Sequence, residues 1–310
     1  MSFAFVFPGQ GSQKVGMGKA LCEAFPEARA VFEQASGSLG EDIAALCFDG
    51  PEDKLNLTEN TQPALLTVSA AAAAVLKSKG LTPAFVAGHS LGEYSALVSA
   101  GVMTVSNGVK VVRQRGRFMQ EAVPVGQGGM VAVIGLAQEK IAEACARAQS
   151  EGVVAMANQN SPDQIVISGA QKAVEKAAAL CKEMGAKRAI PLPVSAPFHS
   201  PLMAPAAEKL AAVLHPALFS NATIPVVTNV TAQPVSIGGL LRKGLVEQMT
   251  APVLWIDSVQ FIISQGVTTF VEVGPGNVLA GLIRRIDSSV TTLSAGDPES
   301  LNKFLSSLAH

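Results

Sequence analysis

Short apolar runs alternate along this chain with longer segments whose apolar residues recur at helical spacing. The runs have the length of β-strands and lie at residues 3–7, 84–88, 224–230 and 269–273. The segments between them read as helices: Pro63 lies near the start of one that ends before Gly80, and Asn277 precedes another. This alternation predicts a mostly parallel sheet covered by helices, which is the α/β class.

The pattern changes between Gly129 and Val194. The order there is strand, helix, strand, strand, helix, strand, over residues 130–135, 138–149, 152–158, 164–168, 171–185 and 188–194. This is the order of the split ferredoxin-like unit. The parallel pattern resumes beyond it, so we expect a small inserted domain. The domain bounds are residues 126–195 for the insert and residues 1–125 and 196–310 for the larger domain, with boundaries at the turn-rich segment 124–129 and the proline-rich segment 191–197.

The composition is that of a globular protein with a large core. Of the 310 residues, 48% are hydrophobic and 15% are charged. The longest apolar stretch, Ala64 to Leu76, is interrupted by Thr67 and Ser69 and is too short to span a bilayer. The N-terminus has neither the positive region nor the cleavage-site pattern of a signal peptide. We therefore expect a cytoplasmic protein that makes no membrane contact.

Charge and cysteine spacing argue against two further classes. The net charge of −1 argues against nonspecific binding to nucleic acid. The cysteines form no C-x-x-C pair and have no clustered histidines to complete a metal site, so buried, idle thiols are favoured. They are Cys22, Cys47, Cys145 and Cys181.

The segment FPGQGSQKVGMGK, which ends the first predicted strand, is rich in glycine but does not match a nucleotide-binding loop. Lys14 stands where the dinucleotide fingerprint needs glycine, and Met17 stands where the P-loop needs lysine. A glycine turn after a first strand still suits backbone N–H donors at the carboxyl ends of the strands. This loop is therefore either part of an oxyanion hole or a simple tight turn.

A candidate nucleophile lies in GHSLG, residues 88–92, which fits the pattern G-x-S-x-G. The motif follows a predicted strand and precedes a predicted helix, as a nucleophile elbow requires. The flanking glycines let the chain turn sharply, which exposes the Ser90 hydroxyl near the free N–H groups of the helix. The alternative is a serine N-cap beside a glycine turn.

The base for Ser90 has to come from elsewhere in the chain. His199 lies in a loop that returns from the inserted segment and is our candidate base. His89 is adjacent to Ser90 and is expected to point away and to pack or hydrogen-bond locally, while His215 and His310 are expected at the surface. No acidic third member stands out. Each of the weighed residues serves equally well as a surface charge or a helix support: Glu247, Asp257 and Glu272.

An arginine falls on the apolar side of the helix predicted after the elbow helix. At about 100° per residue, Arg115 lies in the middle of the apolar half, Arg113 at its margin and Arg117 outside it. A buried guanidinium requires an anionic partner. That partner is either a protein carboxylate or the free acid of a bound acyl group, whose geometry the arginine fork matches. The second alternative suggests a dicarboxylic thioester as substrate.

Several segments together resemble the malonyl-CoA:acyl-carrier-protein transacylase family. They occur in consistent order from end to end of the chain. They are FPGQGSQ (7–13), GHSLGEYSAL (88–97), RQRGRFMQ (113–120), NSPDQIVISG (160–169), PFHS (197–200) and VEVGPGNVL (271–279). The resemblance implies an α/β-hydrolase-like large domain with a parallel sheet and an inserted ferredoxin-like small domain.

The resemblance also implies roles for site residues. It makes Ser90 the nucleophile, His199 the base and later the acid, and Arg115 the holder of the malonyl carboxylate. It places the oxyanion on the backbone amides of Gln10 and Leu91. It has the imidazole oriented by the backbone carbonyl of Gln248, which would explain why no third acid is found.

The implied reaction is a ping-pong transfer of malonyl from coenzyme A to the phosphopantetheine thiol of acyl carrier protein, with no cofactor. The implied partners are malonyl-CoA and acyl carrier protein, without nucleic acid or membrane. Phe198 shapes the acyl pocket or fills the core. The alternatives are a serine thioesterase or other hydrolase, the malonyl transferase subunit of a malonate decarboxylase, and a non-enzymatic module that docks a carrier protein.

Overall fold

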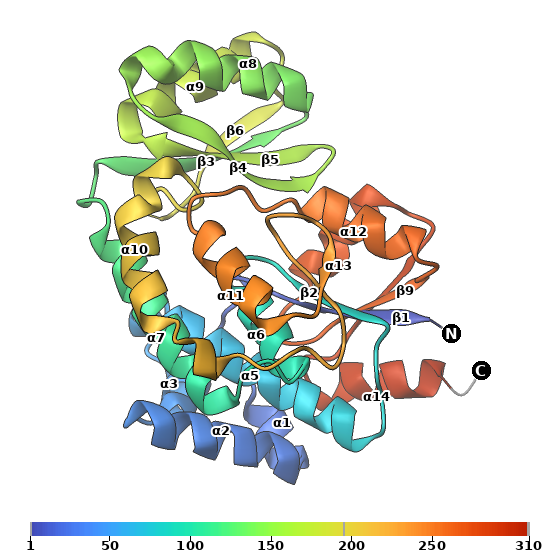
Figure 1. Ribbon diagram of the computed structural model, residues 1–310. Coiled ribbons are helices and arrows are strands. Elements are labelled where there is room, and N and C mark those ends of the chain that lie inside the picture. Colours follow the sequence, from blue (N-terminus) through green and yellow to red (C-terminus); the bar gives the residue numbers. More distant parts are fainter. Residues whose placement is uncertain (1, 195, 309–310) are drawn as a thin grey trace.

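A computed structural model describes residues 2–194 and 196–308 and contains two separate sheets (Figure 1). The larger sheet has the strand order β10-β9-β1-β2-β7-β8 and is parallel except for the β7–β8 pair. Its strands are β1 (Phe3–Phe7), β2 (Phe85–Gly88), β7 (Val226–Val227), β8 (Pro234–Val235), β9 (Thr269–Glu272) and β10 (Thr291–Ser294). The predicted parallel α/β arrangement is therefore present.

Helices cover both faces of this sheet. Successive side chains of a strand point to opposite faces, so apolar residues on each face need a helical layer to bury them. On β1, the phenylalanines Phe3 and Phe5 face one helical layer, while Ala4 and Val6 face the other. The first layer is built mainly from α1 (Lys19–Ala24), α2 (Pro26–Leu39), α5 (Thr58–Ser78), α6 (Leu91–Ser99) and α7 (Val105–Glu121). The second layer is built from α12 (Trp255–Ser264) and α13 (Val278–Ile286).

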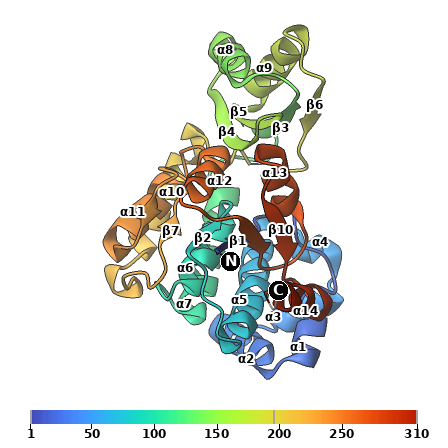
Figure 2. The same ribbon diagram turned by 90° about the vertical axis from the view of Figure 1, so that its right-hand side faces the viewer.

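The remaining elements of the large part pack around these layers. They are α3 (Ile43–Asp49), α4 (Glu52–Leu55), α10 (Ala204–Val213), α11 (Gly238–Glu247), α14 (Pro298–Ser307) and two short 3₁₀ helices, Pro201–Met203 and Pro216–Leu218. In Figure 2, α10 and α11 lie on the opposite side of the sheet from α13 and α14.

The second sheet is antiparallel, has the order β4-β5-β3-β6, and lies with its two helices at one end of the molecule (Figures 1 and 2). Its elements are β3 (Gly128–Ile134), α8 (Gln138–Ala148), the 3₁₀ turn Gln149–Glu151, β4 (Val154–Ser161), β5 (Gln164–Ala170), α9 (Gln171–Glu183) and β6 (Arg188–Pro191). The predicted succession of strands and helices is confirmed. The only bridge to a residue outside this sheet joins Asn158 to Val253, among the residues that the structure describes.

The structure corrects the predicted bounds of one strand and one helix and adds an edge strand. The strand expected over 224–230 is limited to Val226–Val227, because it pairs with β2 over only these residues. The edge strand β10 was not predicted. The helix expected to start near Pro63 begins at Thr58, because its first turn is made of polar residues that no apolar pattern reveals.

Two absences concern membranes and metals. In the part of the chain that the structure describes, no helix is long and apolar enough to cross a membrane. Within the same residues, no group of His, Cys, Asp and Glu side chains could hold a metal ion. All of the cysteines are free and buried, as predicted from their spacing.

Candidate active site

The backbone turns sharply at Ser90, between the end of β2 and the start of α6. Ser90 has φ 51° and ψ −103°, a positive φ that residues other than glycine rarely adopt. The flanking glycines make this turn possible. A Cβ on Gly88 would overlap the backbone of Gly92, and a Cβ on Gly92 would overlap the carbonyl oxygen of Phe7. The Ser90 amide donates to Asn229 Oδ1 at 2.7 Å, which holds the turn in place.

The predicted base lies beside this serine. His199 Nε2 is 2.8 Å from Ser90 Oγ, and His199 Nδ1 is 2.9 Å from the backbone oxygen of Gln248. A carbonyl only accepts, so Nδ1 carries the hydrogen and Nε2 is left to accept the serine proton. Burial, together with the nearby positive charge of Arg115, lowers the pKa of His199 to about 3. The imidazole is therefore neutral and ready to act as a base at ordinary pH.

Arg115 lies on α7 at the bottom of the same site and is 1% exposed. Its guanidinium donates to Ser90 Oγ at 3.0 Å, to Gln248 Oε1 at 2.9 Å and to Gln62 Oε1 at 3.0 Å. It also lies over the ring of Tyr94, 5.2 Å from the centroid. No carboxylate among the described residues forms an ion pair with it. Of the two alternatives for its anionic partner, the permanent protein carboxylate is absent.

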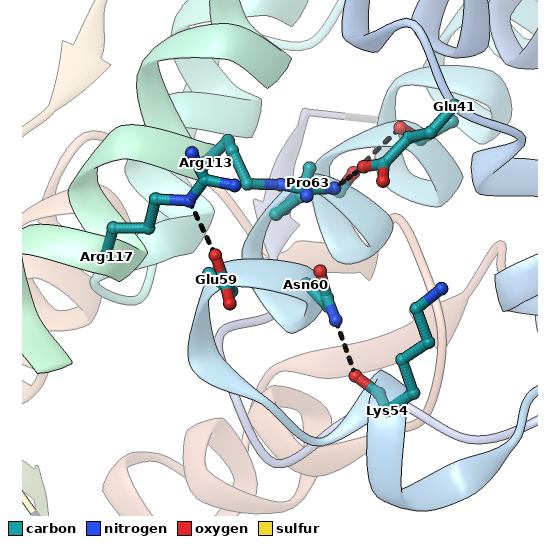
Figure 3. A network of polar contacts seen from close by, with 8 residues as sticks. Glu41, Lys54, Glu59, Asn60, Pro63, Arg113 and Arg117 are labelled. Atoms are coloured by element: carbon teal, nitrogen blue, oxygen red, sulfur yellow. Dashed lines mark hydrogen bonds and ion pairs between the residues drawn. The ribbon is translucent and has the colours of Figure 1, made fainter.

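The other arginines of α7 differ in this respect (Figure 3). Arg113 pairs with Glu41, and Arg117 pairs with Glu59 at 2.6 Å. Their side chains are 12% and 54% exposed, as the helical wheel predicts for a marginal and an outer position. Only Arg115 is directed at the serine.

Gln10 and Leu91 also lie at this cavity, as the resemblance implies. Neither backbone N–H donates to an acceptor among the described residues. The cavity has a volume of about 120 Å³ and includes Phe198 in its wall. The residues around it are Gln10, Gln62, His89, Ser90, Leu91, Arg115, Met119, Met130, Asn158, Leu192, Val194, Phe198 and His199. Backbone N–H groups without an acceptor are the kind of donor that an oxyanion requires.

Sequence reasoning missed a layer of polar side chains behind these groups. Glu93 is 1% exposed, and its Oε2 accepts from Gln248 Nε2 and from the Asn229 amide, each at 2.9 Å. Burial raises the pKa of Glu93 to about 7. Gln62, the third acceptor of Arg115, comes from the polar first turn of α5 that was also missed. The one available signal was an acid in an apolar helix, three residues after the serine.

Neither His89 nor His215 hydrogen-bonds to the Ser90 hydroxyl. His89 is half-buried and packs against the Trp255 ring, with centroids 5.7 Å apart, as one of the two alternatives predicts, while its hydrogen-bond partner, Asn160 Oδ1 on β4 at 2.8 Å, is distant in sequence. His215 is exposed after α10, as expected. His310 lies outside the described residues, as does Ser195 at the predicted domain boundary.

The weighed acids take local roles. Glu272 is fully buried and accepts from the Leu279 and Ala280 amides at the start of α13. Glu247 pairs with Lys243 on its own helix. Asp257 lies in the first turn of α12, where a negative charge favours the helix. None of them contacts His199.

Comparison with known proteins finds relatives along nearly the whole chain. The sequence model of the acyl transferase domain family matches residues 4–297. The malonyl CoA-acyl carrier protein transacylase of Bacillus subtilis strain 168 is 48% identical over 306 residues, which covers 98% of this chain and 96% of that protein. The enzyme of the same name from Escherichia coli K12 is 50% identical over 300 residues, covering 96% of this chain and 97% of that protein.

Solved structures are equally similar. The crystal structure of an acyl carrier protein S-malonyltransferase from Vibrio cholerae has a TM-score of 0.96 and 48% identity, covering 98% of this chain and all of that one. The family match spans nearly the whole chain, and the relatives align over nearly their full lengths. On this evidence, the chain belongs to the acyl transferase domain family.

Proposed function

We propose that this chain transfers a malonyl group from coenzyme A to the phosphopantetheine thiol of acyl carrier protein, the step that supplies malonyl units to fatty acid synthesis. Two kinds of support agree. The relatives are named for this activity, and they align with this chain over 96% and 97% of their own lengths. The observation that carries the choice of acyl group is Arg115, a buried cation that forms no ion pair with a carboxylate of the described residues and lies 3.0 Å from the Ser90 hydroxyl.

The first half-reaction acylates the enzyme. Ser90 Oγ attacks the thioester carbonyl while His199 Nε2 takes the serine proton, and the backbone carbonyl of Gln248 holds the resulting imidazolium through Nδ1. The amides of Gln10 and Leu91 donate to the oxyanion of the tetrahedral intermediate. Collapse breaks the carbon–sulfur bond, and the departing thiolate takes the proton from His199. Free coenzyme A leaves a malonyl ester on Ser90.

The second half-reaction repeats these steps with a new nucleophile. The thiol of the carrier protein gives its proton to His199 and attacks the ester carbonyl. Collapse then breaks the carbon–oxygen bond, and Ser90 recovers its proton from His199. Ser90, His199 and the backbone amides serve every step of both halves, so the proposed reaction uses no resident cofactor, and coenzyme A takes part as a substrate.

Arg115 selects the diacid. The guanidinium fork matches the free carboxylate of a malonyl group, and Arg115 is buried, where an ion pair is strong. One of its nitrogens donates to Ser90 Oγ at 3.0 Å. A malonyl carboxylate offers that nitrogen a better acceptor, and the serine oxygen is then free to attack.

The partners of this proposal are malonyl-CoA and acyl carrier protein, in the cytoplasm. A related solved structure supports the second partner. It holds a malonyl-transacylase in complex with the holo acyl-carrier protein of a type II polyketide synthase, with a TM-score of 0.96 and 47% identity over 99% of this chain and all of that one. The two sheets support an α/β-hydrolase-like domain, residues 1–125 and 196–310, with a ferredoxin-like insert, residues 126–195. The insert's strand order β4-β5-β3-β6 has a central antiparallel pair, as that fold requires.

Mass spectrometry after incubation with malonyl-CoA tests the covalent step. We expect a malonyl adduct on Ser90 in the wild type and none in Ser90→Ala. Adding holo acyl carrier protein should remove the adduct and malonylate the carrier. Absence of the adduct from the wild type would refute the mechanism. Release of free malonate faster than transfer to a thiol would favour a thioesterase instead.

A further inference from the structure

Among the described residues, Glu93 is the one buried acid whose hydrogen bonds reach the supports of both Ser90 and Arg115. We propose that it is a positioning residue of this active site: its Oε2 fixes the Gln248 amide and the Asn229 backbone, and through them the directions of Arg115 and Ser90. The inference rests on the proposed function, because it concerns how the same site presents its arginine and its serine to the acyl group.

The first arm of the arrangement runs through Gln248. Its Nε2 donates to Glu93 Oε2 at 2.9 Å, while its other acceptors lie farther away, Ser90 O at 3.2 Å and Asn229 Oδ1 at 3.3 Å. Its Oε1 accepts from Arg115 at 2.9 Å. Reversing the amide would set its NH₂ against the guanidinium and its oxygen against the Glu93 oxygen. The amide therefore has one orientation, and Glu93 is the closest and most polar of the groups that fix it.

The second arm runs through Asn229. Its backbone amide donates to the same Glu93 oxygen at 2.9 Å, and its side-chain oxygen accepts from the Ser90 amide at 2.7 Å. Its side-chain NH₂ donates to the carbonyl of Gly88 at 2.6 Å. Asn229 thus holds the strained turn through both the Ser90 amide and the carbonyl of Gly88. Because Glu93 fixes the backbone of Asn229, it indirectly fixes this turn.

The burial of Glu93 indicates that the arrangement serves a purpose beyond packing. A carboxyl group taken out of water costs several kcal/mol unless it is hydrogen-bonded, and its neighbours on α6 are buried apolar residues such as Leu91 and Leu97. Yet Glu93 has no ion pair among the described residues, and its Oε1 has no hydrogen-bond partner there. Both bonds that it accepts lead to the groups that hold the reacting side chains. An apolar residue would pack at this position without that cost.

The unpartnered oxygen makes the role independent of charge. A proton on Oε1 leaves Oε2 free to accept from both Gln248 and Asn229, so protonated and ionised Glu93 hold the same geometry. Burial raises the pKa of Glu93 toward neutrality, so both forms are accessible. Glutamine reproduces the protonated form: its oxygen replaces Oε2 and its NH₂ replaces the protonated Oε1. Alanine removes the acceptor altogether.

The decisive experiment compares Glu93→Gln and Glu93→Ala with the wild type. kcat/KM is measured for malonyl-CoA and for acetyl-CoA with the same carrier protein. Loss of a hydrogen bond to a charged group corresponds to about 10- to 100-fold. In Glu93→Ala we expect malonyl transfer to fall by about that factor, and acetyl transfer to fall several-fold less because acetyl does not use Arg115. Glu93→Gln should keep the malonyl preference within about threefold of wild type.

A matched control comes from another buried glutamate. Glu272 is fully buried and accepts from two backbone amides, but these belong to α13 and not to the site. Glu272→Ala should lower the thermal unfolding midpoint without changing the ratio of malonyl to acetyl transfer. This control shows what the loss of a purely structural carboxylate does.

The second measurement asks whether the effects of Glu93 and Gln248 on the malonyl preference depend on each other. Gln248→Leu removes the amide but keeps the backbone carbonyl that accepts from His199. If Glu93 sets the malonyl preference through this amide, adding Glu93→Ala to Gln248→Leu should not lower that preference further. Additive losses would overturn this step.

The remaining outcomes separate this inference from the proposed function. A wild type that transfers no malonyl refutes the function itself. If the wild type is active, equal losses on malonyl and acetyl in Glu93→Ala refute the arm that runs through Gln248 to Arg115, and unchanged rates on both refute the positioning role altogether. A Glu93→Gln variant as impaired as Glu93→Ala refutes it as well, because the negative charge rather than the acceptor would then matter. If Glu93→Ala does not fold, Glu93→Leu, which fills the space but also lacks the acceptor, replaces it in both measurements.

Discussion

Replacing Arg115 by alanine is the sharpest test of the substrate assignment. In the wild type, the guanidinium lies 3.0 Å from Ser90 Oγ and has no carboxylate partner in the described part of the chain. The malonyl carboxylate is therefore the anion expected to pair with it. Arg115→Ala would leave that carboxylate inside a site with few other donors.

The size of the loss follows from the chemistry of buried ion pairs. Removing one partner of a buried, hydrogen-bonded charge pair costs about 2 to 5 kcal/mol. At about 1.4 kcal/mol per factor of ten, kcat/KM for malonyl-CoA should fall between about 30-fold and about 4,000-fold. Acetyl-CoA carries no free carboxylate, so its transfer loses only the contact between Arg115 and Ser90 and should change by less than about tenfold.

Stability has to be measured alongside activity. The substitution leaves the side-chain oxygens of Gln62 and Gln248 without the donor they share, at about 1 to 3 kcal/mol for each unsatisfied group. Rates should therefore be compared well below the unfolding midpoint of Arg115→Ala. A stopped assay that quantifies malonyl-carrier and acetyl-carrier by mass spectrometry gives both rates from one preparation.

Arg117→Ala is the matched control, on the same helix and two residues away (Figure 3). Arg117 pairs with Glu59 at a 54% exposed position, where an ion pair contributes at most about 1 kcal/mol. We expect no change in either rate. Equal losses of malonyl and acetyl transfer in Arg115→Ala would refute the carboxylate clamp. So would a malonyl-specific loss in Arg117→Ala.

Two other properties are open to direct measurement. Gly92→Ala should lower the free energy of unfolding by about 1 to 3 kcal/mol and abolish adduct formation at Ser90, because the new Cβ overlaps the Phe7 carbonyl. Gly281→Ala, whose Cβ meets no atom within 4 Å, should instead stabilise α13 by about 1 kcal/mol. Comparable urea midpoints for the two variants would contradict this. The folded-state pKa of His199 is lowered from 6.5 to about 3, so the unfolded chain binds more protons between these values and His199 makes stability rise with pH across that window. Urea unfolding of wild type and His199→Gln from pH 3 to pH 7 checks this, and parallel curves would show that His199 does not titrate as expected.

Elements with a repeating pattern could be predicted from the sequence. The helical wheel of α7 correctly separates buried Arg115 from the marginal Arg113 and the exposed Arg117, because seventeen residues in one helix define its faces well. Short apolar segments are harder, because an apolar run indicates burial rather than strand pairing. The run at 224–230 is partly buried, yet only Val226–Val227 pairs with a neighbouring strand.

The polar side chains behind the reacting groups, Gln248 and Asn229, could not be predicted from a repeating pattern. Gln248 ends a helix and Asn229 lies in a loop, and the sequence separations of their partners range from 19 to 158 residues. No spacing rule links side chains that only the folded chain brings together. Glu93, by contrast, directly follows the motif that identified Ser90.

No acid contacts the His199 ring among the described residues. The Ser-His-Asp arrangement places a carboxylate on the imidazole Nδ1, and here that position is taken by the backbone oxygen of Gln248. A neutral carbonyl orients the ring without adding a negative charge beside the site where the malonyl carboxylate must bind. The acid lies one layer farther back, where Glu93 contacts the amide of Gln248 and the backbone of Asn229. The substrate of this enzyme is itself an anion, so a carboxylate kept away from the base avoids repelling it. The same reason accounts for the absence of an acid on the His199 ring and for Arg115, whose guanidinium is left to pair with the substrate.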